Sequence, residues 1–166
     1  GELSLHFQPI VDLSAAARGT VGHEALLRWR HPQRGLLSPA DFLQVAEESG
    51  QIVDIGRWVI QHATTVAAAA GPDAGYVSVN VSALQLGRPG LLDTVEAALA
   101  DSGLPPERLV LELTESVMLS AAPSAYRELA QLDHLGTRIV VDDFGTGFSA
   151  LSYLRDLPIR GIKVDR

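Results

Sequence analysis

The sequence predicts an α/β fold, built as a barrel of parallel strands surrounded by helices. Apolar segments of strand length alternate with helical stretches along the 166 residues, which is typical of parallel strands joined by helical crossovers. A parallel barrel brings the carboxyl ends of its strands to one rim, so polar residues at these ends would form one site. The residues that follow apolar segments in this way are Glu24, Asn80, Glu112, Asp142 with Asp143, and Lys163.

The predicted order of elements opens with two strands in direct succession. Residues 6–12 are expected to form the first strand and residues 21–29 the second, with an Ala-rich connection between them. Side chains alternate between the two faces of a strand. The second strand therefore places Glu24, Leu26 and Arg28 on one face.

Two helices are expected before the third strand. The first begins at Ser38, which is a capping residue followed by proline, and ends at Gly50. The second covers residues 52–70, where apolar side chains recur at helical spacing. The third strand covers residues 76–82, because small polar residues alternate there with valines.

The second half of the chain alternates regularly between helices and strands. The expected elements are a helix over 89–102, a strand over 109–116, a helix over 123–135, a strand over 138–144, a helix over 149–157 and a strand over 161–165. An open, doubly wound sheet is the rival architecture, but the Gly-rich turn GxGxxG that it commonly uses follows none of these strands. A closed barrel has about 250 residues. Residues 1–166 are therefore expected to form a single domain that lacks its last strands.

Composition favours a soluble domain and argues against several classes of function. Hydrophobic residues make up 46% of the chain, yet no apolar run reaches the roughly 18 residues of a membrane helix. The absence of cysteine excludes a disulfide framework and a thiolate zinc site. A formal charge of −7 argues against binding to DNA or RNA polymers. We expect a cytoplasmic location, either for a free protein or for the cytoplasmic part of a membrane-anchored parent.

Five sequence blocks stand in a specific order. They are residues 22–29 (GHEALLRW), 79–82 (VNVS), 111–116 (LELTES), 142–149 (DDFGTGFS) and 162–165 (IKVD). Together they resemble the EAL family of bacterial cyclic di-GMP phosphodiesterases, which takes its name from the triplet at residues 24–26. The resemblance extends over the whole chain. It implies a TIM-type (β/α)8 barrel variant whose first strand is antiparallel, and hydrolysis of cyclic di-GMP to linear pGpG.

The resemblance also implies a role for each matched residue. The implied ligands of two Mg²⁺ or Mn²⁺ ions are Glu24, Asn80, Glu112, Asp142 and Asp143, with Asp142 bridging the ions. Lys163 would contact the attacking water, and Glu115 would steady the loop after the two aspartates. The implied substrate contacts are Gln8, Leu26, Arg28 and Asp165.

The chemistry of the donors agrees with the implied cofactors. All the ligands are oxygen donors, which suit Mg²⁺ or Mn²⁺ better than zinc or copper. We expect the parent protein to form a homodimer and to carry other signalling domains. A receptor that binds cyclic di-GMP without cleaving it is the alternative, because the chain ends before a glutamate and a glutamine of the family pattern. A scaffolding domain is a second alternative, although it would have no use for oxygen ligands at every strand end.

Overall fold

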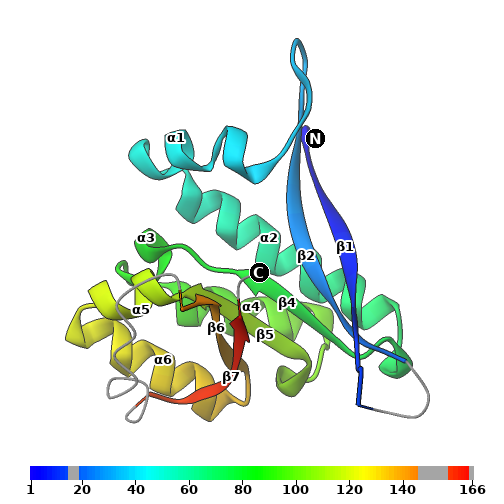
Figure 1. Cartoon of the computed structure of the whole chain (residues 1–166), viewed down its shortest axis with the longest axis vertical. Helices are drawn as coiled ribbons and strands as arrows, with labels where there is room; N and C mark the ends of the chain where they lie inside the picture. The colour runs from blue at the N-terminus through cyan, green and yellow to red at the C-terminus, as the bar shows by residue number, and fades with distance from the viewer. Residues whose placement is uncertain (15–18, 146–156, 165–166) are drawn as a thin grey trace.

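The computed structural model describes residues 1–14, 19–145 and 157–164 as one twisted sheet with helices beside it (Figure 1). Its strands are β1 (Leu3–Val11), β2 (Thr20–His31), β3 (Gly35–Leu37), β4 (Tyr76–Asn80), β5 (Leu109–Thr114), β6 (Arg138–Phe144) and β7 (Ile159–Val164). Its α-helices are α1 (Leu43–Glu48), α2 (Ile52–Ala69), α3 (Ala83–Leu86), α4 (Leu91–Ser102), α5 (Glu115–Ser120) and α6 (Pro123–Leu135). Short 3₁₀ turns cover Pro39–Asp41, Pro72–Ala74 and Pro106–Arg108.

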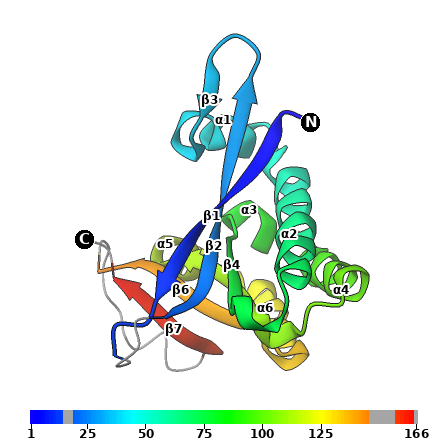
Figure 2. The same ribbon diagram turned by 90° about the vertical axis from the view of Figure 1, so that its right-hand side faces the viewer.

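The strands are ordered β1-β2-β4-β5-β6-β7, with β3 paired to β2. The first pair is antiparallel, and every pair from β2 through β4, β5 and β6 to β7 is parallel. This topology, together with the likeness to solved structures described below, confirms the predicted α/β class and the antiparallel first strand. The β1–β2 pair and the short β3 project beyond the rest of the sheet (Figures 1 and 2).

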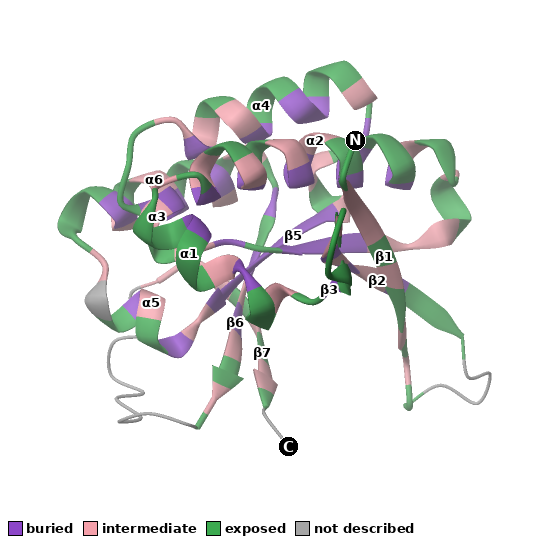
Figure 3. Ribbon diagram, turned by 90° about the horizontal axis from the view of Figure 1, so that it is seen from above, coloured by how far each residue is buried: buried purple, intermediate pink, exposed green. Residues whose placement is uncertain are grey.

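One face of the sheet carries the hydrophobic core. Helices α2, α4 and α6 lie along this face (Figure 2), and the strand residues turned toward them are buried (Figure 3). The most completely enclosed of these strand residues are Val77, Val79, Leu109, Leu111, Leu113, Ile139 and Val141. Each such side chain contributes about 1.5–3 kcal/mol when it is fully buried. Because side chains alternate, the residues between them point to the opposite, inner face, where the polar groups gather.

The helix predicted over residues 38–50 is divided in two. Phe42 is buried and adopts φ −144°, which is outside the helical region, so the chain changes direction between the 3₁₀ turn and α1. Ser38 still begins this segment, and its backbone N–H and hydroxyl both donate to Asp41 Oδ2. The hydrogen bonds hold the pKa of Asp41 below its ordinary value.

Residues 31–35 join β2 to β3 in a hairpin, because β2 continues to His31 and pairs with β3. Two predicted strands end earlier than expected. The strand predicted over 76–82 ends at Asn80, and Ser82 caps α3. The strand predicted over 109–116 ends at Thr114, which caps α5. A small polar residue at a strand end fits both a further strand residue and the N-cap of a following helix, and here Ser82 and Thr114 are N-caps.

Two further predictions concern the helix after β6 and the absence of a membrane span. The helix predicted over residues 149–157 lies almost wholly outside the described residues. Within the described part of the chain, no helix combines the length and hydropathy that a membrane span requires.

Candidate active site

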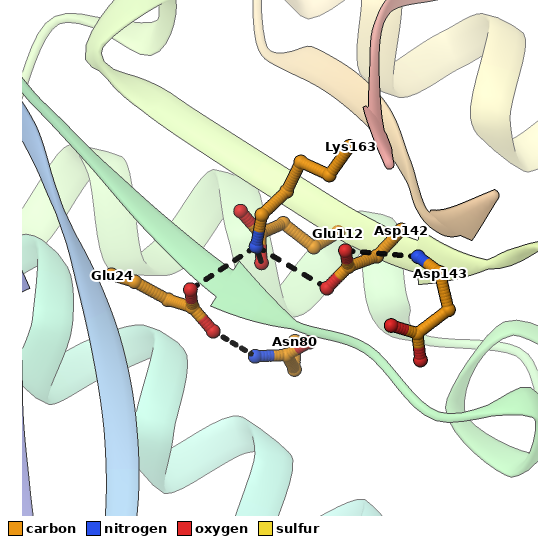
Figure 4. A network of polar contacts seen from close by, with 6 residues as sticks. All are labelled: Glu24, Asn80, Glu112, Asp142, Asp143 and Lys163. Carbon is orange, nitrogen blue, oxygen red and sulfur yellow. Dashed lines mark hydrogen bonds and ion pairs between the residues drawn. The ribbon is translucent and has the colours of Figure 1, made fainter. Parts of the chain in front are cut away.

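The inner face of the sheet holds a lysine surrounded by three carboxylates (Figure 4). The ammonium nitrogen of Lys163 on β7 lies 3.1 Å from Glu24 Oε2, 2.8 Å from Glu112 Oε2 and 3.2 Å from Asp142 Oδ2. These carboxylates come from β2, β5 and β6, so four strands contribute to one cluster. The parallel order of the strands creates this meeting point, since it aligns the carboxyl ends of segments far apart in the sequence.

Asn80 and Asp143 complete the polar network at the edge of this cluster. The amide of Asn80 donates from Nδ2 to Glu24 Oε1 over 3.0 Å. The backbone N–H of Asp143 donates to Asp142 Oδ1 over 2.9 Å, which places Asp143 beside Asp142 (Figure 4). Glu24 Oε1 and Asp142 Oδ1 are therefore held by hydrogen bonds from outside the cluster, while Glu24 Oε2 and Asp142 Oδ2 face the lysine.

Glu115 lies behind the cluster rather than within it. As the first residue of α5 it is buried, and its Oε2 accepts a hydrogen bond from the backbone N–H of Gly145 over 2.9 Å. This contact ties the chain just after the two aspartates to the end of β5. The side-chain direction expected for a regular strand does not apply at this position, because the strand has already ended at Thr114.

The residues implied as substrate contacts extend along the β1–β2 arm. Gln8 is exposed and stands opposite Glu24 in the antiparallel register. Leu26 and Arg28 follow on the same face of β2, and both are partly buried. The guanidinium of Arg28 donates from Nη1 to the carbonyl of Leu27 over 2.8 Å. Asp165 lies outside the described residues.

Burial and charge act in opposite directions within the cluster. Burial raises the pKa of Glu112, which is 2% exposed, and the nearby Glu24 carboxylate adds to this rise, while Lys163 and Ser78 partly offset it. Burial alone would lower the pKa of Lys163, but the carboxylates of Glu112 and Glu24 outweigh burial and raise it above its ordinary value. Because three carboxylates surround one ammonium, Lys163 is positively charged at neutral pH.

Ser78 is a polar residue of this site to which sequence reasoning gave no role. It lies two residues before Asn80 on the same face of β4 and is completely buried, and its hydroxyl has no partner at hydrogen-bond geometry. Ser78 also lowers the pKa of Glu112, which partly offsets the rise caused by burial. Its position on the polar face of an alternating strand was the available signal, although a serine there is equally common in a structural role.

The cluster suits a divalent cation in its chemistry, but its present spacing suits an ammonium. Glu24, Glu112 and Asp142 offer oxygens from three strands, a donor set that hard cations prefer. Mg²⁺ binds oxygen at about 2.0–2.1 Å. The oxygens here stand about 3 Å from the lysine nitrogen instead. Accordingly, within the described ranges no group of three or more His, Cys, Asp or Glu side chains is arranged to hold a metal ion.

The fold and the acidic rim define a barrel-type domain with its polar site at the carboxyl ends of the strands. The sequence model of the EAL domain matches residues 1–166. The chain therefore belongs to the EAL domain family.

Several curated proteins resemble the chain. The bifunctional diguanylate cyclase/cyclic di-GMP phosphodiesterase MucR of Pseudomonas aeruginosa strain PAO1 is 45% identical over 170 residues, which cover 99% of this chain and 24% of MucR. The cyclic di-GMP phosphodiesterase NbdA of the same strain is 43% identical over 169 residues, which cover 99% of this chain and 21% of NbdA. The chain thus spans less than a quarter of the length of either relative.

Solved structures show the same fold. The PaMucR phosphodiesterase in its c-di-GMP complex superposes with a TM-score of 0.90 at 43% identity, covering 99% of this chain and 67% of that one. The FimX EAL domain from Pseudomonas aeruginosa bound to c-di-GMP gives a TM-score of 0.88 at 31% identity, covering 99% and 66%. These likenesses support the barrel-type architecture derived above from the strand order.

Proposed function

We propose that this domain hydrolyses cyclic di-GMP to linear pGpG in a reaction that depends on two divalent cations, Mg²⁺ or Mn²⁺. The observation that carries the proposal is the meeting of Glu24, Glu112 and Asp142 around Lys163 on one rim, in a chain of the EAL family. Two relatives named as cyclic di-GMP phosphodiesterases share more than 40% of its residues. A domain that served only as a scaffold would have no need for a buried carboxylate such as Glu112.

The proposed ligands are Glu24, Asn80, Glu112, Asp142 and Asp143. When bound, divalent cations neutralise the charge of a phosphodiester and lower the pKa of a coordinated water. Asp142 is suited to bridge two ions because one of its oxygens faces the cluster and the other faces the Asp143 side. Asp143 is exposed and lies at the outer edge of this arrangement, where a second ion could enter from solvent.

Lys163 and Glu115 would serve the reaction in different ways. Lys163 carries a positive charge on this rim, so it can donate a hydrogen bond to the attacking oxygen and offset the negative charge that develops on the phosphoryl oxygens. Glu115 does not reach the cluster, and we propose that it holds the chain at Gly145 through its hydrogen bond. It is therefore a positioning residue rather than a reacting one.

Substrate contacts are proposed along the inner side of the β1–β2 arm. Gln8 beside Glu24 can bind a polar edge of the substrate, and Leu26 offers an apolar contact next to it. Arg28 carries donors suited to a phosphate or to a guanine edge. Its guanidinium now donates to a backbone carbonyl, and it can exchange this hydrogen bond for one to the substrate. Asp165 is proposed as a further contact from the sequence resemblance alone.

The first test is the substitution Glu24→Ala, measured by product chromatography and by calorimetry with cyclic di-GMP. We expect turnover to fall below detection, because one of the converging carboxylates is lost. Glu96→Ala is the matched control, since Glu96 is an exposed glutamate on α4 outside the site, and it should keep full activity. Normal hydrolysis by Glu24→Ala would contradict the proposal.

The same measurements separate hydrolysis from binding alone. Binding of cyclic di-GMP with release of pGpG supports the enzyme, whereas binding without turnover would support a receptor module. We further propose that the domain is part of a larger signalling protein, because the relatives that it matches are several times longer. We also propose, from the sequence resemblance alone, that it acts in the cytoplasm and as a homodimer.

A further inference from the structure

We propose that the Lys163 ammonium occupies the position of the first divalent cation while the protein is free of metal, so that metal binding requires the ammonium to move away. The inference rests on the proposed need for divalent cations and concerns how the same site is regulated. Lysine and metal would then bind the carboxylates in alternation.

The directions of the carboxylate oxygens support this alternation. Glu24 Oε2, Glu112 Oε2 and Asp142 Oδ2 all point to a single place, and the Lys163 nitrogen is there at 2.8–3.2 Å from each. The other oxygens of Glu24 and Asp142 are engaged by Asn80 and by the backbone of Asp143. A cation that used all three carboxylates together would therefore have to enter the volume that the ammonium now fills.

The charge of the cluster explains why an internal cation is needed before metal arrives. Glu112 is 2% exposed, and two more carboxylates lie within reach of the same ammonium. A buried carboxylate without a counter-ion is strongly unfavourable, so Lys163 supports the folded, metal-free state. A divalent cation at hydrogen-bond distance from the ammonium would be repelled by it, so the two cannot share the centre.

The position of Lys163 allows it to leave. Its side chain is 34% exposed, in contrast to the almost fully buried Glu112. Withdrawal of the flexible lysine side chain would leave it at the edge of the site, beside the ions, where the proposed contact with the attacking water is made.

The test compares Mn²⁺ binding and metal-free stability in Lys163→Met and in the parent protein. Calorimetry with Mn²⁺ alone should show tighter binding to Lys163→Met, by about five- to 150-fold, the usual range for coupled binding events. Thermal unfolding in a chelator should occur at a lower temperature for Lys163→Met, because three carboxylates lose their counter-ion. Arg160→Met is the matched control, since Arg160 lies on the same strand but pairs with Asp133, away from the site.

A second variant keeps the test decisive if Lys163→Met does not fold without metal. Lys163→Arg retains a cation, so it should fold in chelator and should bind Mn²⁺ no more tightly than the parent. Equal or weaker Mn²⁺ binding by Lys163→Met would overturn this inference while leaving the proposed hydrolysis intact. If Mn²⁺ bound to neither the parent nor any variant, both the inference and the proposed metal dependence would be wrong.

Discussion

A single backbone angle sets the direction of Asp143. Among the described residues it is the non-glycine residue with positive φ, at +54°. The pairing of β6 with β7 shifts between Val141 and Phe144, so the two aspartates lie at an irregularity in the strand. Regular alternation would send two adjacent side chains to opposite faces. The irregular backbone instead lets the neighbouring carboxylates of Asp142 and Asp143 lie near one rim.

Substitutions at Asp143 can separate its charge from its backbone. Aspartate and asparagine tolerate the left-handed region, whereas a β-branched residue there is strained by about 1–2 kcal/mol. Asp143→Asn should therefore keep the unfolding temperature of the parent, and Asp143→Val should lower it by roughly 2–8 °C. Both should lose Mn²⁺-stimulated turnover, since both lose the carboxylate. Equal unfolding temperatures for the two variants would show that the angle imposes no strain.

At the scale of elements, a glutamine joins the chain after Asn80 to helix α2. Gln85 is buried, and its Oε1 accepts the backbone N–H of Ser82, while Ser82 Oγ accepts the backbone N–H of Gln85. The Gln85 amide lies directly against Gly56 of α2, where an added methyl group would overlap it. The absence of a side chain at Gly56 thus lets α3 dock, and α3 fixes the chain that leaves β4 at the site.

The substitution Gly56→Ala tests this docking. Alanine favours a helix interior by about 1 kcal/mol over glycine. Overpacking a buried contact costs roughly 1–3 kcal/mol, so we expect Gly56→Ala to lower the free energy of unfolding. Urea denaturation measures the change. Gln85→Ala removes the overlapping amide, so in the Gln85→Ala background Gly56→Ala should no longer destabilise and should instead show the helix preference. A destabilisation of equal size in both backgrounds would contradict the proposed contact.

The longer elements were predictable from the sequence, and the short ones were not. The predicted bounds 123–135 and 138–144 coincide with α6 and β6, since a proline, a glycine and a β-branched run mark their limits. Strand β3 has only three residues, which is too short for any periodicity. Its pairing depends on the hairpin that joins it to β2, and no local pattern distinguishes that hairpin from a loop.

The sequence identified the residues of the candidate site but not their arrangement in space. The strand-end pattern identified Glu24, Glu112, Asp142 and Lys163, and the structure brings all four together. Sequence spacing could not show that Lys163 would lie at the centre of the carboxylates. That position depends on the register and twist of strands separated by up to 139 residues along the chain.

For the whole molecule, the described strand order begins at β1 and ends at β7, so both have one unpaired edge, as does the short β3 beside β2. Edge strands offer unpaired backbone groups, and exposed apolar side chains beside them favour association between copies. Strand β7 carries such residues, because Ile162 is 45% and Val164 is 77% exposed. Strand β1 contributes the exposed Val11 at its end. This combination predicts that the 166-residue chain associates with itself as its concentration rises.

Sedimentation velocity at increasing protein concentration measures this association. We expect Val164→Lys to shift the chain toward monomer, because a lysine on an edge strand places a charge where a second copy would pair. Val45→Lys is the matched control: Val45 is 65% exposed on α1, away from both edges, so its substitution should leave association unchanged. If the chain is monomeric at every concentration, or if both variants alter association equally, the edge of β7 is not what joins the copies.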